Sequence, residues 1–290
     1  MCIRDRCTTY SNLVGWVFNV LRYTNNVTRN YMKHNLKIFW LLAKNSMRVT
    51  TQGRLGVVIF TLGKAIRFAF MFFLLFFIFS KTKVLKGYTF QEAALFYMIF
   101  SVIDTISQIL FREVYRFRQL VVSGSLDSVL LKPYHPFLRI LVGGVDLLDV
   151  VLLIPYTIIA IVIALQGHIV FGNFIVFLAL FINAIWITTS FHIIVLAFGV
   201  LTTEVDHTIL IYRDITGLGR FPMAIYKEPI RSFFTFVIPI GIMTSFPPQA
   251  LLGTLSPTAF IISFVISSIL FYCAMNLWTY ALKKYQSWGG

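Results

Sequence analysis

Charged residues are scarce in this chain. Asp, Glu, Lys and Arg make up 12% of its 290 residues, whereas a soluble domain carries about 25%. Hydrophobic residues make up 58%, which is more apolar surface than a water-soluble core of this size can hide. These proportions exclude a soluble enzyme and a disordered chain, and they indicate a protein whose solvent is mostly the lipid bilayer.

Acidic residues are rarer than basic ones. The chain has 11 Asp and Glu against 25 Lys and Arg, a net charge of +14. No basic soluble domain accompanies this excess, so we expect no nucleic acid among the partners. In a membrane protein, basic residues gather in cytoplasmic segments and set the orientation.

Motifs for metal binding and catalysis are also lacking. The three cysteines, Cys2, Cys7 and Cys273, do not have the spacing of a metal site. The only near match to a phosphate-binding loop is Gly63-Lys64, but Val58 and Ala65 stand where the loop requires Gly and Ser or Thr. We therefore expect a chain that is not an enzyme, with no metal and no cofactor of its own.

Long uncharged stretches are what the sequence does have. No Asp, Glu, Lys or Arg occurs from residue 150 to 203 or from 232 to 282. A bilayer span needs about 20 helical residues, so each stretch accommodates two spans, and Gly and Pro residues near 167–172 and 247–257 mark the turns. With two spans upstream, residues 55–289 are predicted to form an all-α polytopic membrane domain of six transmembrane helices, at about 57–79, 90–110, 138–165, 173–201, 231–246 and 257–281.

An amphipathic helix is predicted before the first span, over 33–54. Leu36, Trp40 and Met47 recur at helical spacing, and Lys37 and Lys44 lie on the opposite face. This pattern is typical of an interfacial helix that lies on the membrane; a docking face for a soluble partner is the alternative. Residues 1–32 form a poorly defined segment.

The distribution of basic residues predicts the orientation. One side of the six predicted spans carries 20 Lys and Arg, and the other carries only Lys81, Lys83 and Lys86. Both termini are therefore expected in the cytoplasm, in a multi-pass protein of the cell membrane. Lys64 and Arg67 fall inside the first span and are expected to reach toward cytoplasmic headgroups.

Three acidic residues fall within predicted spans: Asp104, Asp146 and Asp149. Asp146 and Asp149 are one helical turn apart and share a face, and each carries a penalty of roughly 2.5–3.5 kcal/mol in mid-membrane. They either form a proton or cation site or contribute to a polar interface between helices. Arg139 is a candidate partner of Asp146 two turns away.

The connection between the second and third predicted spans has its own pattern. Arg112, Glu113, Arg116 and Arg118 alternate with apolar residues, which predicts a short amphipathic helix. Gly124 ends it, and a second short helix follows before Lys132-Pro133 stops it. Such an elbow is either simple surface structure or a docking site for a soluble subunit.

Four motifs, in this order, give the chain a resemblance to a family. They are the interfacial helix, Gly124-Ser125-Leu126-Asp127 with Leu131-Lys132-Pro133, the run from Phe221-Pro222 through Arg231 to Phe246-Pro247 and Leu252-Gly253, and the ending Trp278 to Gly289. Around six spans, the combination resembles the ABC-2-type transporter permeases, over about residues 33–289.

The resemblance implies half of a bacterial exporter. The chain would pair with a separate ATP-binding subunit, which binds ATP and Mg, and with a second permease chain, identical or different. The elbow at 112–132, with Arg112, Glu113, Arg116, Arg118 and Asp127, would couple to the ATPase. The bent piece with Pro247, Pro248 and Gly253 would form the external gate.

Two other classes remain as alternatives. An ion-coupled secondary transporter would use Asp104, Asp146 and Asp149 as a relay; it predicts inverted repeats, and none is evident between 55–165 and 173–281. A membrane-embedded enzyme or an assembly factor would need a polar cluster of catalytic type, which the sequence does not indicate.

Overall fold

The computed structural model describes residues 33–48, 54–82, 84–167, 170–202 and 205–286. In these parts every element is helical, and the only strand-like pairing is an isolated bridge between Leu85 and Tyr88. The predicted all-α class is confirmed. The predicted segment 1–32 and residues 49–53 of the predicted interfacial helix lie outside the described residues.

Five helices are long and apolar enough to cross a bilayer. They are α2 (Arg54–Lys81), α3 (Phe90–Leu110), α7 (Leu147–Leu165), α8 (Phe171–Thr202) and α13 (Pro257–Lys284). Each overlaps one of the predicted spans.

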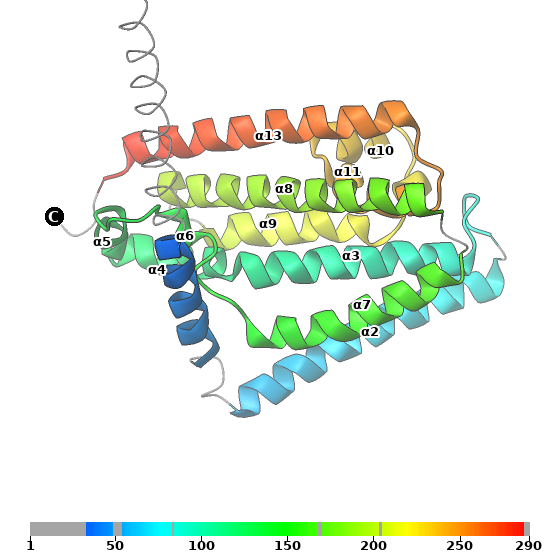
Figure 1. Cartoon of the computed structure of the whole chain (residues 1–290), viewed down its shortest axis with the longest axis horizontal. Helices are drawn as coiled ribbons and strands as arrows, with labels where there is room; N and C mark the ends of the chain where they lie inside the picture. Colours follow the sequence, from blue (N-terminus) through cyan, green and yellow to red (C-terminus); the bar gives the residue numbers. More distant parts are fainter. Residues whose placement is uncertain (1–32, 49–53, 83, 168–169, 203–204, 287–290) are drawn as a thin grey trace, which may run out of the picture.

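The long helices lie roughly side by side, with α3 in the middle of the bundle (Figure 1). In the most apolar 18-residue segment of α3, 72% is buried, whereas the corresponding segments of α2 and α7 are each 11% buried. At one end of the bundle, here called the elbow end, lie α4 (Phe117–Val122), α5 (Ser125–Leu130), α6 (Phe137–Ile140), the helix at 33–48 and the end of α13 (Figure 1). The opposite end is called the far end.

Side-chain caps define where three of the long helices begin. Thr89 and Glu92 form a capping box at α3, in which Glu92 Oε2 accepts from the Thr89 amide at 2.8 Å. Asp146 caps α7 by accepting from the Leu148 amide at 3.0 Å, and Ser256 caps α13, where Pro257 occupies the first helical position.

The third predicted span begins later than expected. It was predicted from residue 138, but α7 begins at Leu147. The intervening stretch holds the short helix α6 and then Gly143-Gly144, which breaks the helical run. Asp146 is therefore the N-cap residue of α7 and not a residue inside a continuous span.

The predicted span at 231–246 is also not a single helix. That interval holds α10 (Ile230–Ser232), a π-helical turn (Phe233–Val237) and α11 (Ile240–Thr244), followed by α12 (Phe246–Leu251). Before them, α9 (Val205–Gly217) runs beside α8 away from the elbow end, and α10 and α11 lie toward the far end (Figure 1). Two 3₁₀ turns, η2 (Leu218–Arg220) and η3 (Met223–Ile225), connect the two groups.

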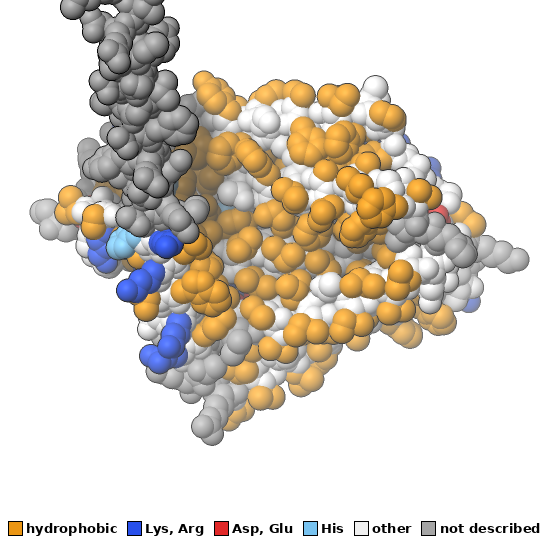
Figure 2. Space-filling view, in the orientation of Figure 1, with side chains coloured by type: hydrophobic (Ala, Val, Ile, Leu, Met, Phe, Trp, Pro, Cys, Tyr) orange, Lys and Arg blue, Asp and Glu red, His pale blue; other side chains and the backbone are white. Residues whose placement is uncertain are grey.

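The helix at 33–48 lies at the elbow end and buries Ala43 and Ser46. Leu36 and Trp40 stay exposed on it, at 53% and 67%. Figure 2 shows Lys and Arg side chains gathered at this end, whereas apolar side chains cover the face between the two ends. A basic rim beside a broad apolar belt is the surface expected of a protein that sits in a bilayer.

Candidate functional site

The elbow after α3 has the predicted break at Gly124, but the first predicted helix is divided into a 3₁₀ turn and a short α-helix. The 3₁₀ turn η1 (Arg112–Arg116) and α4 are separated from α5 by Gly124, whose φ of 69° is left-handed and favours glycine. Val114, Phe117 and Leu126 are fully buried in the core at the elbow end, together with Ile140, Leu196 and Trp278. The elbow is therefore packed onto the bundle, and its polar side chains are held in fixed positions.

Glu113 lies at the centre of this elbow. Its carboxylate accepts from Arg139 Nη1 at 2.7 Å and from Arg116 Nη1 at 3.2 Å, and the side chain is 3% exposed. Gly144 makes room for it, because a Cβ there would lie 2.3 Å from Glu113 Oε1. The expected partnership of Arg139 with Asp146 is replaced by its ion pair with Glu113.

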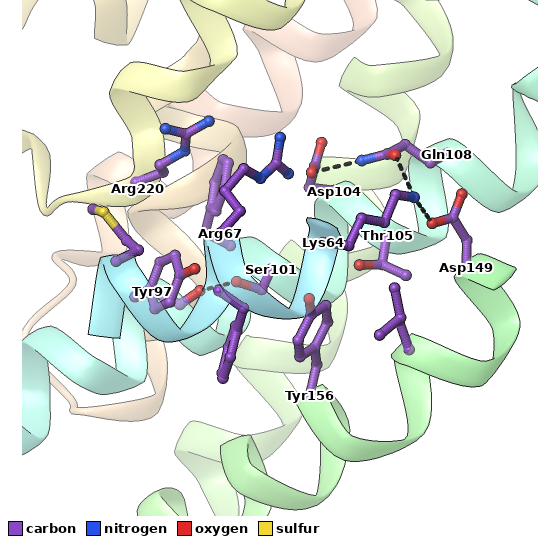
Figure 3. A pocket seen from close by; sticks show the side chains of 14 residues that line it. Lys64, Arg67, Tyr97, Ser101, Asp104, Thr105, Gln108, Asp149, Tyr156 and Arg220 are labelled. Carbon is purple, nitrogen blue, oxygen red and sulfur yellow. Dashed lines mark hydrogen bonds and ion pairs between the residues drawn. The ribbon is translucent and has the colours of Figure 1, made fainter. Parts of the chain in front are cut away.

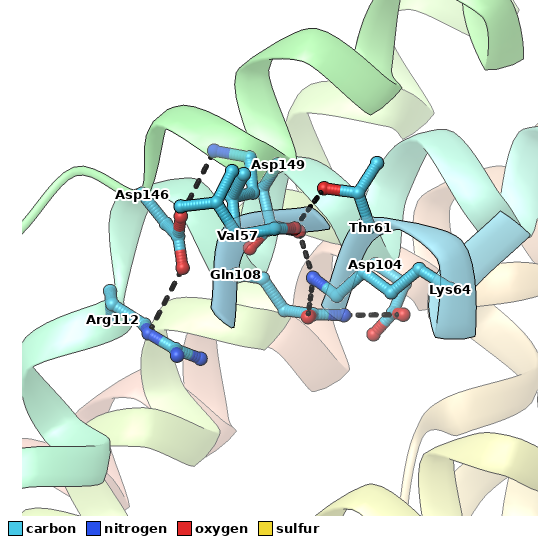
Figure 4. A network of polar contacts seen from close by, with 9 residues as sticks. Val57, Thr61, Lys64, Asp104, Gln108, Arg112, Asp146 and Asp149 are labelled. Carbon is cyan, nitrogen blue, oxygen red and sulfur yellow. Dashed lines mark hydrogen bonds and ion pairs between the residues drawn. The ribbon is translucent and has the colours of Figure 1, made fainter. Parts of the chain in front are cut away.

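Asp146 pairs instead with the elbow. Arg112 Nε lies 3.3 Å from Asp146 Oδ2, while Asp146 Oδ1 caps α7 (Figure 4). The two ion-pair systems, Glu113 with Arg139 and Arg112 with Asp146, thus attach η1 to α6 and to the start of α7. Both involve a carboxylate that is almost completely buried.

A second polar chain continues into the bundle from α7. Asp149, 1% exposed, forms an ion pair with Lys64 of α2. Lys64 Nζ also donates to Gln108 Oε1 at 3.3 Å, and Gln108 Nε2 donates to Asp104 Oδ2 at 2.8 Å (Figure 4). Lys64 therefore binds across three helices inside the bundle, where the sequence predicted a side chain directed at headgroups.

All three predicted intramembrane carboxylates have partners within the chain. An arrangement in which each acid is matched by a cation or an amide is what a polar helix interface requires. Of the two roles that the sequence left open, this geometry fits the interface better than an open proton or cation site.

A pocket, here called the polar pocket, lies between α2, α3, α7 and η2 (Figure 3). It is lined by the cations Lys64, Arg67 and Arg220, and by the acids Asp104 and Asp149. Tyr97 and Tyr156 form part of its wall. The free space inside is about 40 Å³, which is enough for water.

Two contacts tie the elbow to α9. Arg118 Nη1 lies 3.5 Å from Asp206 Oδ2 on the surface. The Arg213 guanidinium of α9 lies 5.9 Å from the centre of the Tyr115 ring in the elbow. Arg112, within the elbow, lies 5.6 Å from the same ring. Burial raises the pKa of Tyr115 to about 12, so its hydroxyl stays protonated at neutral pH.

Asp127 lies on the other part of the elbow, in the first turn of α5. Burial and the neighbouring Asp127 raise the pKa of Tyr285 to about 12. Tyr285 follows α13 directly, so the end of the last long helix meets α5 and Tyr285 remains a hydrogen-bond donor at neutral pH.

The predicted gate residues lie together at the far end. Pro247 and Pro248 are buried in the first turn of α12, whose Phe246, Ala250 and Leu251 pack in the core against α8. Gly253 follows with φ +72°, and a Cβ there would lie 2.8 Å from Asn173 Nδ2. The turn after α12 thus closes tightly against the start of α8.

The sequence identifies the acidic residues of the network but not the residues that pair with them. It did not assign Arg220 or Gln108, and it did not connect Glu113 with Arg139 or Lys64 with Asp149. The one available signal was the position of Lys64, well inside an apolar span rather than at its boundary.

These features define the class: a helical, multi-pass membrane protein with a buried polar network that joins a packed elbow to the bundle interior. A family model described as ABC-2 family transporter protein matches residues 65–289, more than three quarters of the chain. The chain belongs to this family and is a membrane permease subunit of an ABC transporter, a transport subunit and not itself catalytic. Comparison with curated proteins and with solved structures finds no match.

Proposed function

We propose that the chain is one half of a bacterial ABC exporter, which works with a separate ATP-binding subunit and with a second permease chain. ATP and Mg bind to the ATP-binding subunit. The elbow, residues 112–132, is the coupling contact. The observation that carries this assignment is the attachment of the elbow by two ion pairs with nearly buried carboxylates: Glu113 pairs with Arg139 of α6, and Arg112 pairs with Asp146 at the start of α7.

The elbow end faces the cytoplasm in this proposal. Half of the 20 Lys and Arg of the described parts lie in the helix at 33–48, in the elbow and at the end of α13. Positive residues favour the cytoplasmic side. The helix at 33–48 then lies at the membrane surface, where exposed Trp40 meets the interface, and offers the ATPase a second contact.

The stretch from α9 to α12 makes the fifth of six crossings. It extends beside α8 from the elbow end to the far end (Figure 1), and α11 and α12 share a core with α8. A crossing built of short helices is tolerated where it is covered by protein. Pro247, Pro248 and Gly253 then lie on the external side, as a gate.

Coupling follows the polar network. The ATPase moves the elbow, and Glu113 with Arg139, together with Arg112 with Asp146, carries that displacement to the start of α7. One turn further along, Asp149 passes it to α2 through Lys64. Buried ion pairs are suited to transmit a displacement, because breaking one leaves an uncompensated buried charge. The helices that a buried pair joins therefore move together.

Charge reversal at the elbow should uncouple the transporter. Arg118→Glu removes an exposed basic group from the proposed docking surface, and we expect it to abolish most of the stimulation of ATPase activity by the permease. Insertion and folding should be unaffected, because exposed ion pairs such as Arg118–Asp206 contribute about 0–1 kcal/mol. The measurement is ATP hydrolysis by the purified complex in nanodiscs, after co-purification from the host.

Arg231→Glu is the matched control. Arg231 has the same side-chain exposure as Arg118, 52%, and pairs with an exposed acid, Glu228, at 4.0 Å, but at the far end. It should leave stimulation unchanged. Equal effects of the two variants, or full coupling in Arg118→Glu, would contradict the assignment of the elbow, and absence of a co-purifying ATPase would contradict the proposed function as a whole.

A further inference from the structure

The two arginines of the polar pocket have no acidic partner of their own. Among the residues that the structure describes, no carboxylate oxygen lies within 4 Å of the guanidinium group of Arg67 or of Arg220. Figure 3 shows the Arg67 guanidinium beside the Asp104 carboxylate and the Arg220 guanidinium on the other side of Arg67. Asp104 accepts instead from the Gln108 amide at 2.8 Å.

Charge in the pocket does not balance. Lys64 and Asp149 neutralise each other in their ion pair. Against the two remaining cations, Arg67 and Arg220, stands one carboxylate, Asp104. One positive charge is left over, and it is not enclosed: the Arg67 side chain on α2 is exposed and Arg220 is half-buried.

The position of Arg67 makes this excess unfavourable in a lipid environment. Arg67 is near the midpoint of α2 (Arg54–Lys81), which places it about 20 Å from the start of the helix. A charge at such a depth is retained where it faces a polar cavity or a ligand path, not lipid. An anion that enters the pocket would neutralise the excess, and paired guanidinium groups are well suited to bind the oxygens of a carboxylate, sulfonate or phosphate group.

The remaining wall of the pocket is aromatic and apolar. The Phe68 ring stacks on Tyr156 at 4.8 Å and on Tyr97 at 5.7 Å, and Met71 and Leu152 line the same space. Such a surface fits the apolar body of an organic molecule. The free space of about 40 Å³ takes only the charged group, so a larger ligand requires α2, which is mostly uncovered, to move outward.

We propose that the polar pocket binds organic anions: an acidic group between Arg67 and Arg220, and an apolar or aromatic body against Phe68, Tyr97 and Tyr156. As a statement about substrate, this rests on the proposed function. Binding itself requires neither ATP nor the ATPase, so it is tested on the permease chain alone.

The test is calorimetric titration of the full-length chain in phosphatidylcholine nanodiscs, with empty nanodiscs subtracted. The probes are 1-naphthalenesulfonate, inorganic sulfate and 1-naphthylmethylammonium. We expect the sulfonate to bind most tightly, sulfate more weakly because it lacks the ring, and the cation not at all. Arg67→Gln/Arg220→Gln should weaken sulfonate binding at least tenfold, since both charge-assisted contacts are lost.

Lys283→Gln/Lys284→Gln is the matched control. It removes two charges from the exposed end of α13 and should leave the affinity unchanged. If the glutamine variant fails to fold, Arg67→Lys/Arg220→Lys keeps both charges but loses the planar fork, and it should also weaken binding. Phosphatidylglycerol added to the nanodiscs identifies the source of the anion: competition indicates a lipid headgroup, and no competition indicates a soluble organic anion.

Three binding results would overturn the proposal. They are the absence of sulfonate binding, equal binding of the naphthyl cation, and an affinity that the arginine substitutions do not change. Dissociation of a permease dimer by the same substitutions, measured by mass photometry, would also overturn it, because the arginines would then serve a protein partner. Binding without a co-purifying ATPase would retain the site and reject the exporter.

Discussion

Replacing Asp149 with leucine is expected to destabilise the folded chain by about 3–5 kcal/mol, the usual result of removing one partner from a buried ion pair. Asp149 is 1% exposed, and its Lys64 partner has a side-chain exposure of 16%. Without the carboxylate, the lysine ammonium keeps the Gln108 amide and the Phe60 ring as neighbours but has lost its counter-charge. The measurement is thermal unfolding in nanodiscs, with the yield of monodisperse protein as a second readout.

The double variant Lys64→Met/Asp149→Leu separates structure from chemistry. Removing both charges should recover most of the stability, because apolar residues of similar volume often replace a buried pair without loss. A stable double variant that still transports would leave no role for Asp149 as a proton carrier. Recovery of stability together with loss of proton-dependent transport would instead favour the ion-coupled alternative. Asp206→Asn is the control, since Asp206 is 54% exposed and its pair with Arg118 should matter little.

Glu113→Ala is expected to have the second-largest effect, about 3 kcal/mol. It removes two charge-assisted hydrogen bonds, each with a typical contribution of about 1.5–3 kcal/mol, and the lower end applies because Arg116 and Arg139 retain access to water. The same substitution should weaken ATPase stimulation, since it releases the elbow from α6. Chemical unfolding and ATP hydrolysis measured on one preparation test both consequences.

Gly144→Ala provides an independent test of the same contact. Its new methyl group would lie 2.3 Å from Glu113 Oε1, so we expect a loss of about 1–3 kcal/mol in the native chain. In the Glu113→Ala background that space is free, and Gly144→Ala should then be nearly neutral. Gly172→Ala, where nothing lies within 4 Å of the new Cβ, is the control. Additive effects of the substitutions at 113 and 144 would contradict the described packing.

The sequence was most informative where the signal is local. Gly124 and the alternating charges of Arg112–Arg118 predict the helical character of the elbow and its break at residue 124, because a left-handed residue and helical periodicity act over a few positions. The apolar runs likewise specify five long helices, because span length follows from bilayer thickness. The family resemblance also came from ordered local motifs, and the family match over residues 65–289 confirms it.

Contacts distant in sequence could not be predicted in this way. Lys64 and Asp149 are 85 positions apart, and nothing in either neighbourhood identifies the other. The helix α9 falls between the predicted spans 173–201 and 231–246, because Asp206, Arg213 and Asp214 lower the hydropathy of its segment. Hydropathy averages over the whole segment, whereas only one face of α9, with Val205, Ile209 and Thr216, is buried; Asp206, Arg213 and Asp214 are on the exposed face.

The junction between α3 and the elbow has a mechanical consequence. α3 ends at Leu110 and η1 begins at Arg112, and the Phe111 amide between them still donates to the Ser107 carbonyl at 2.9 Å. There is no slack at this joint to absorb a push on the elbow. α3 is the most enclosed of the five long helices and is about 30 Å long. In the proposed coupling, a displacement of the elbow would therefore be delivered along the axis of α3 to the far end.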